Sequence, residues 1–201
     1  SDLLSVVEKY LQNQVMPLYG NTHTTTSITG LQSTCFRHEA RQIISQSLNC
    51  NTKEDVVLFV GSGCTGAINK LVAILGLNHA PTQKDGTTPP ESERAVVFVG
   101  PHEHHSNILP WRESHADVIH VKENADGAFD VVDLKLKLEE YKGRKLKIGS
   151  FTMASNITGI VAPAHEITEM MHRAGGLAFW DCATAGPYMK IDMNPVVPGE
   201  G

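Results

Sequence analysis

The chain has 201 residues, of which 41% are hydrophobic, and its formal net charge is −5. This composition is typical of a folded globular chain, and without a block of Lys or Arg we expect no binding to nucleic acid or to an anionic membrane by bulk charge. No apolar run approaches the length of a membrane span, and the first residues, SDLLSVVEKY, lack the pattern of a signal peptide.

The four cysteines are scattered and form no C-x-x-C pair; they are Cys35, Cys50, Cys64 and Cys182. We expect reduced thiols in a cytoplasmic compartment rather than a disulfide framework. No paired Cys/His cluster is available for zinc, so no metal site is predicted.

Short apolar runs alternate with helix-like segments along the chain. The sequence predicts strands over residues 56–61, 95–100, 117–121, 146–153 and 177–181. It predicts helices over about 67–75 and 131–141, and another that starts at Pro163. The polar stretch 79–93 predicts a flexible loop. Strands separated by helices indicate an α/β fold, with three layers (α/β/α) and a mainly parallel sheet.

Small and polar residues follow four of the five predicted strands. The segments are GSGCTG, PHEHHSN, ASNITG and DCATAG. Because ligands of such sheets bind beyond the carboxyl ends of the strands, these segments should converge on one site.

Gly61, Gly63 and Gly66 form a G-x-G-x-x-G pattern between a predicted strand and a predicted helix. Such glycines let a phosphate approach the N–H groups of a helix N-terminus, although a tight turn also explains them. A nicotinamide cofactor would need an acid about 20 residues later. Asp85 has that spacing but lies in the polar loop, and Glu103 lies much farther along.

Five segments in this order resemble the cysteine desulfurase-like group of the class V aminotransferases. The segments are YGNTHTTTS (19–27), GCTGAINKLV (63–72), EHHSNILPW (103–111), SNITGIVAP (155–163) and WDCATAG (180–186). The resemblance implies the aspartate aminotransferase fold, pyridoxal 5'-phosphate (PLP) as cofactor and an amino-acid substrate, converted through a carbanion that PLP stabilises. It also implies a homodimer, because segment 19–27 resembles one that lies near a neighbouring subunit's active site.

The resemblance assigns a phosphate-binding and a ring-stacking role. Gly63, Cys64 and Thr65 would bind the cofactor phosphate with backbone N–H groups and the Thr65 hydroxyl, with Cys64 as a backbone donor and not a nucleophile. His104 would stack on the pyridine ring and handle protons near the reacting carbon. His102 and His105 receive no role.

Three further residues would contact the cofactor by the same resemblance. Asp181 would keep the pyridine nitrogen protonated, although a carboxylate there could also cap a turn. Asn156 would lie near the phenolic oxygen, or serve as a turn residue ahead of Gly159. Thr184 stands where cysteine desulfurases usually carry a glutamine that bonds this oxygen. The sequence therefore leaves open whether sulfur, an amino group or a proton is transferred.

The resemblance also implies that the chain is part of a longer enzyme. Residues 1–30 would form an N-terminal arm, and 31–201 most of the PLP-binding large domain. The lysine that carries the cofactor would lie beyond Gly201, because Lys190 comes too early and lacks the family's motif. Such a fragment would be inactive alone. Two alternatives stay open: a nicotinamide-dependent oxidoreductase that uses GSGCTG, and a non-catalytic cofactor-binding protein of the same fold.

Overall fold

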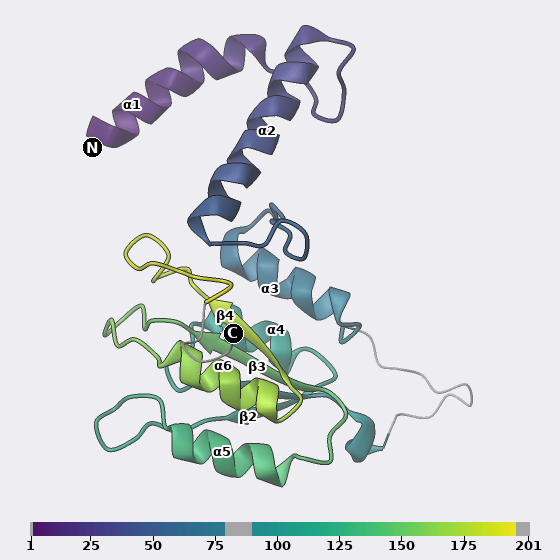
Figure 1. Ribbon diagram of the computed structural model, residues 1–201, viewed down its shortest axis with the longest axis vertical. Coiled ribbons are helices and arrows are strands. Elements are labelled where there is room, and N and C mark those ends of the chain that lie inside the picture. Colours follow the sequence, from purple (N-terminus) through teal and green to yellow (C-terminus); the bar gives the residue numbers. More distant parts are fainter. Residues whose placement is uncertain (1, 79–89, 196–201) are drawn as a thin grey trace. The chain divides into compact units, whose positions relative to one another are not determined.

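The structure is a computed structural model that describes residues 2–78 and 90–195 (Figure 1). The chain divides into two compact units. Residues 60–189 form one unit, and residues 1–59 together with 190–201 form the other.

A parallel sheet forms the centre of unit 60–189. Its strands are β1 (Val96–Val99), β2 (Asp117–His120), β3 (Lys147–Thr152) and β4 (Leu177–Asp181), in the spatial order β2-β1-β3-β4. Every pairing is parallel. These strands lie where four of the five predicted strands were placed, and the predicted parallel α/β fold is confirmed.

Alternating residues of β1 show how the sheet is covered on both faces. Val96 and Phe98 pack in a core cluster with residues of α5 (Val131–Glu140) and α6 (Ala164–Arg173). Val97 and Val99 pack in a second cluster with residues of α3 (Gly63–Ile74) and α4 (His105–Arg112). All four side chains are fully buried, and burying such a side chain stabilises a fold by roughly 1.5–3 kcal/mol. The three layers are visible in Figure 1.

The helix starts follow local chemistry. The Asp130 carboxylate accepts hydrogen bonds from the N–H groups of Val132 and Asp133, and so caps α5. Pro163 precedes the first residue of α6, as its fixed φ favours. In α3, which lies where a helix was predicted, Ile68 and Val72 are buried, and Leu71 and Leu75 pack against the same cluster.

The predicted strand over 56–61 is wrong. Among the described residues this segment pairs with no strand, and the side chains of Val56, Leu58 and Phe59 are largely exposed. An apolar run forms a strand only when a neighbouring strand takes up its backbone hydrogen bonds. The G-x-G-x-x-G pattern therefore lacks the preceding strand that the dinucleotide-binding motif requires.

The other unit is helical at its start. It contains α1 (Asp2–Tyr10), the short π-helix η1 (Leu11–Val15), the 3₁₀-helix η2 (Met16–Leu18) and α2 (Ile28–Ser47). The Ser27 hydroxyl caps α2 by accepting from the Gly30 N–H at 3.1 Å. Residues 190–195 bond to the segment after α2, where the Met193 N–H donates to the Leu48 carbonyl at 2.9 Å. No helix in the described part of the chain is long and apolar enough to cross a membrane.

Most of the predicted loop 79–93 lies outside the described residues. Within its last part, Glu91–Glu93 form the 3₁₀-helix η3 ahead of β1. The division at residue 30 that the sequence suggested stays a prediction.

Candidate cofactor site

The carboxyl ends of β1, β3 and β4 lie side by side, since the strands are parallel and adjacent. His104 follows β1, Asn156 follows β3, and Asp181 is the last residue of β4. In a sheet of this kind a ligand site forms at this edge.

Asp181 is a buried carboxylate, only 8% exposed. One of its oxygens accepts a hydrogen bond from the Ala183 N–H at 2.9 Å. Within the described residues no Lys, Arg or His side chain forms an ion pair with it. A buried carboxylate is costly without a cation, so its surroundings suit a positively charged ligand atom.

The start of α3 presents free backbone donors. Ser62 (φ 64°) and Gly63 (φ 62°) both adopt the left-handed conformation, and Ser62 does not cap the helix with its side chain. The first turn closes only when the Gly66 N–H reaches the Ser62 carbonyl at 3.2 Å. The N–H groups of the first helical residues are therefore available to an anion.

Cys64 and Asp181 lie together. Burial, followed by a hydrogen bond to Asp181, raises the pKa of the Cys64 thiol to about 12. Burial and the Asp181 charge likewise raise the pKa of Cys182 to about 11. Both thiols therefore stay protonated near neutral pH.

His104 directly precedes α4 and is exposed. Its Nδ1 accepts from the Ser106 N–H at 3.2 Å and lies 2.9 Å from the Ser106 hydroxyl. The imidazole thus caps the helix and leaves its ring face available. His105 lies edge-on to it, with ring centroids 6.1 Å apart.

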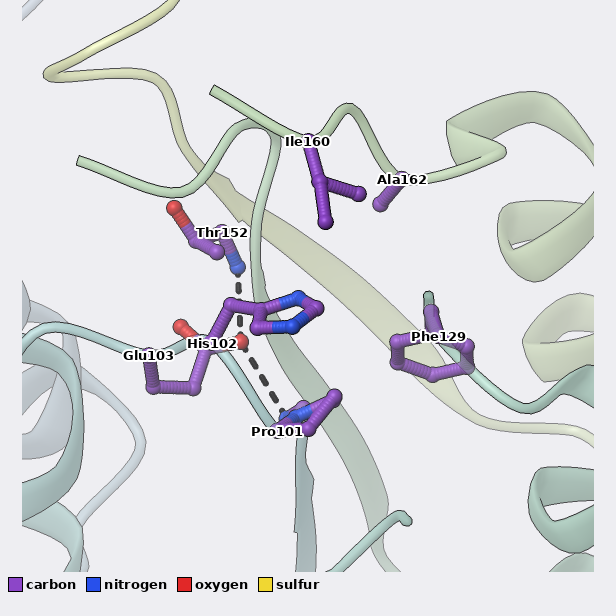
Figure 2. Close-up of a pocket in the computed structure, with 8 residues that line it drawn as sticks. Pro101, His102, Glu103, Phe129, Thr152, Ile160 and Ala162 are labelled. Carbon is purple, nitrogen blue, oxygen red and sulfur yellow. Dashed lines mark hydrogen bonds between the residues drawn. The ribbon is translucent and has the colours of Figure 1, made fainter. Parts of the chain in front are cut away.

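Glu103 lies at this sheet edge, although the sequence indicated it only as a poorly spaced acid for a nicotinamide cofactor. Its Oε1 accepts from the Gly100 N–H at 3.1 Å. It also accepts from the Thr152 N–H at 2.8 Å (Figure 2). Its Oε2 accepts from the Asn107 amide at 2.6 Å. Burial is the main reason that the pKa of Glu103 rises to about 7, and the Asp181 charge adds to it. Because backbone and amide groups of the protein already occupy this carboxylate, it is not free to serve as the acid of a nicotinamide site.

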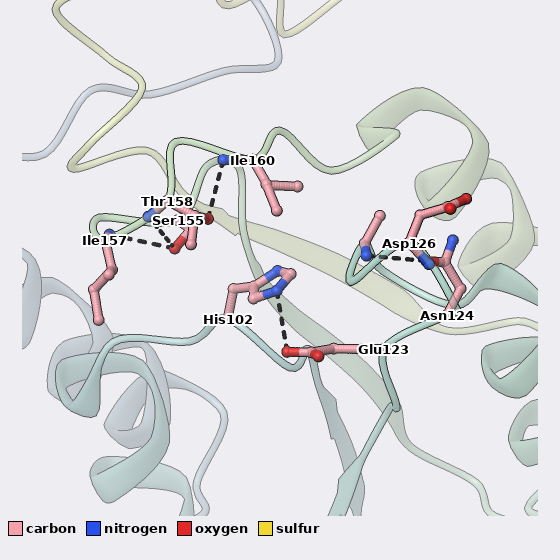
Figure 3. Close-up of polar contacts among 9 residues, drawn as sticks. His102, Glu123, Asn124, Asp126, Ser155, Ile157, Thr158 and Ile160 are labelled. Carbon is pink, nitrogen blue, oxygen red and sulfur yellow. Dashed lines mark hydrogen bonds and ion pairs between the residues drawn. The ribbon is translucent and has the colours of Figure 1, made fainter.

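Glu103 also lines a small pocket. It is lined by residues 100–103 and by Phe129, Thr152, Ile160 and Ala162 (Figure 2). At its rim His102 Nε2 lies 3.3 Å from a carboxylate oxygen of Glu123, which follows β2 (Figure 3). His102 therefore belongs to this rim, and it has a charged partner of its own.

Asn156 and Thr184 lie on turns beside the strand ends. The Ser155 hydroxyl accepts from the N–H groups of Ile157 and Thr158 (Figure 3). Asn156, in the resulting turn, is exposed. Thr184 is half-buried in the turn that follows Asp181. Among the described residues, neither side chain forms a hydrogen bond with Asp181.

Two other expectations from the sequence concern Lys190 and a metal site. Lys190 is exposed, and its ammonium lies 3.9 Å from an Asp192 carboxylate oxygen. Among the described residues no group of three or more His, Cys, Asp or Glu side chains could hold a metal ion.

The chain matches the family model for class-V aminotransferases over residues 1–196, and it belongs to that family. It is 28% identical over 178 residues to a probable cysteine desulfurase of Halalkalibacterium halodurans, covering 87% of this chain and 40% of that protein. It is 29% identical over 181 residues to a cysteine desulfurase of Synechococcus elongatus, covering 87% of this chain and 26% of that protein. The chain thus spans less than half the length of these relatives.

Solved structures agree with the fold. An apo cysteine desulfurase from Thermococcus onnurineus matches with a TM-score of 0.72 at 20% identity, over 92% of this chain and 42% of that chain. The cysteine desulfurase CsdA of Escherichia coli matches with a TM-score of 0.62 at 23% identity, over 94% of this chain and 43% of that chain.

Proposed function

We propose that the full-length protein carrying this chain is a PLP-dependent enzyme that acts on an amino acid. The observation that carries the proposal is the buried Asp181 carboxylate, which has no cationic partner among the described residues. Membership of the class V aminotransferases supports the cofactor, and the desulfurase relatives make L-cysteine the first substrate to test.

The residues at the strand ends fit this cofactor. The free N–H groups at the start of α3 suit a phosphate dianion, and the Thr65 hydroxyl is exposed beside them. The exposed His104 ring can cover a flat aromatic ring. The Asp181 carboxylate suits a protonated ring nitrogen, because that nitrogen would supply the positive charge that the surroundings of Asp181 lack.

When bound, PLP would accept electrons from the substrate through its ring. Asp181 would hold the proton on the ring nitrogen, and His104 could accept or return a proton near the reacting carbon. Asn156 and Thr184 would lie near the phenolic oxygen. Thr184 is shorter than the glutamine usual in desulfurases, so sulfur transfer is one outcome to test beside transfer of an amino group or a proton.

Substitutions of Asp181 and His104 should affect different properties, namely proton exchange and cofactor retention. Asp181→Asn should leave cofactor bound with some loss of affinity, but exchange of the substrate α-proton should fall at least tenfold, which corresponds to about 1.4 kcal/mol of barrier. His104→Ala should weaken cofactor retention and shift the absorption maximum, since it removes a contact worth on the order of 1 kcal/mol. Absorption spectra, dialysis and NMR of α-proton exchange in ²H₂O measure these effects.

Other results would reject parts of the proposal. Wild-type exchange rates in Asp181→Asn would show that the role of Asp181 is wrong. A colourless full-length protein that binds NADH tightly would favour an oxidoreductase. Cofactor binding without conversion of any amino acid would favour a non-catalytic protein of the same fold.

The proposal extends to assembly and location. Segment 19–27 resembles one that lies near a neighbouring subunit's active site, so the full-length enzyme is proposed to be a two-fold homodimer. A fully active monomer in sedimentation would contradict it. The four free thiols fit a reducing compartment such as the cytoplasm, which fractionation would test.

A further inference from the structure

A buried polar network connects the loop before α4 to strand β3. The Glu103 carboxylate accepts from the Asn107 amide, and the Asn107 carbonyl oxygen accepts from the Ser150 hydroxyl at 2.6 Å. The Trp111 indole N–H donates to the Ser150 hydroxyl at 3.0 Å and lies 3.4 Å from the Asn107 oxygen. Asn107, Trp111 and Ser150 are at most 3% exposed.

The Trp111 indole orients the Asn107 amide in this network. An indole N–H can only donate, so the oxygen of the Asn107 amide must face Trp111 and Ser150. The NH₂ group of Asn107 must then face Glu103, which has to offer an acceptor there. The other Glu103 oxygen accepts the N–H groups of Gly100 and Thr152, at the ends of β1 and β3.

These contacts hold the residues on both sides of His104. Glu103 directly precedes it, and the Asn107 N–H donates to the His104 carbonyl at 2.8 Å. The His104 ring itself bonds only to Ser106 among the described residues, so its place depends on the backbone that carries it.

We infer that Glu103 is a positioning residue, which together with Asn107 fixes the loop that presents the His104 ring to the cofactor. The inference rests on the proposed function for the identity of the ligand. The network itself depends only on this chain, so a failure of the proposed function can be separated from a failure of the inference.

Exchanging the two polar groups gives a direct test. Glu103→Gln keeps the acceptor for Gly100 and Thr152 but turns an NH₂ group toward that of Asn107. Asn107→Asp places two carboxyl groups in contact. The double variant Glu103→Gln/Asn107→Asp restores a donor opposite an acceptor and leaves an oxygen for Trp111 and Ser150. We expect each single variant to bind PLP about tenfold more weakly, the effect of roughly one lost buried hydrogen bond, and the double variant to recover.

Combination with His104→Ala separates positioning from general stability. If Glu103 acts through His104, Glu103→Gln should shift the absorption maximum of bound PLP in the wild-type background and leave it unchanged in the His104→Ala background. The matched control is Thr168→Val on α6. It removes the hydroxyl that accepts from the Trp180 indole N–H at 3.0 Å, and it should not shift the absorption maximum. Independent effects of Glu103→Gln and His104→Ala would overturn the inference.

NMR of the 201-residue chain tests the same point without cofactor. The His104 ring resonances should change in Glu103→Gln and return in the double variant, while Thr168→Val leaves them in place. If PLP fails to bind to the wild-type protein, the proposed function fails and this measurement still decides the inference. Unchanged His104 resonances in Glu103→Gln would show that Glu103 does not position the ring.

Discussion

The Glu103 carboxyl should make stability depend on pH in an unusual direction. Its pKa rises to about 7 in the folded protein, so between its ordinary value of 4.5 and 7 the folded state binds more protons than the unfolded state. Stability from this group is therefore greatest at low pH and declines as the pH rises toward 7. The decline can reach a few kcal/mol, since one pKa unit corresponds to roughly 1.4 kcal/mol.

Urea denaturation of the wild type and Glu103→Gln between pH 4.5 and 8 measures this effect. The difference in unfolding free energy between the two proteins should change steadily up to about pH 7 and then level off. A constant difference over the whole range would show that Glu103 titrates normally.

The four cysteines should react with iodoacetamide at different rates. Cys35 is exposed, whereas the pKa values of Cys64 and Cys182 are raised to about 12 and 11. Only the thiolate reacts, so alkylation at pH 8 should reach Cys35 well before these two. Peptide mass spectrometry resolves the sites, and in urea all should react at similar rates. Early modification of Cys64 would contradict its assignment as a protonated neighbour of Asp181.

Residues at strand ends were predictable, and their partners were not. Asp181 and His104 follow apolar runs, so their meeting at one sheet edge follows from parallel topology. The structural role of Glu103 was missed, because its hydrogen-bond donors are mainly backbone N–H groups at the ends of two strands. Backbone donors leave no pattern in the side-chain sequence.

At the scale of elements, the first turn of α3 tests how closely the backbone proposed to bind the phosphate is constrained. A Cβ at Gly66 would lie 1.9 Å from the Gly61 carbonyl oxygen, so the turn would have to open. Gly66→Ala should lower stability by roughly 1–3 kcal/mol, as overpacking does, and reduce PLP affinity. Gly143→Ala is the control, because a Cβ there meets nothing within 4 Å. Equal urea midpoints for the two variants would contradict this constraint.

Helices and strands were predicted where periodicity and burial coincide. The strands β1 to β4 carry their own apolar signal, and α5 and α6 have clear helical faces. The segment 56–61 carries the same signal but has no strand beside it, and pairing is a tertiary property. Helix α4 was missed because its sequence HSNILPWR contains Pro110 and no repeated apolar face, so burial of Trp111 and the His104 cap stabilise it instead.

At the scale of the whole molecule, the two core clusters belong to one unit. Every residue of both clusters lies between residues 60 and 189. We therefore expect a chain of residues 60–189 to keep its sheet and to unfold cooperatively in urea. Circular dichroism and dispersed amide NMR signals would show this. A molten chain without dispersed signals would mean that the other unit completes the core.

The network around Trp111 also gives the protein an optical reporter of its own. Indole emission responds to the electric field and hydrogen bonding at the ring nitrogen, and the Trp111 N–H is two hydrogen bonds away from the Glu103 carboxyl. Ionisation of Glu103 should therefore change Trp111 fluorescence near pH 7. In a Trp180→Phe background Trp111 would be the only source of indole emission, because the chain has just two tryptophans. The charge state beneath the cofactor site could then be followed in real time without any added label.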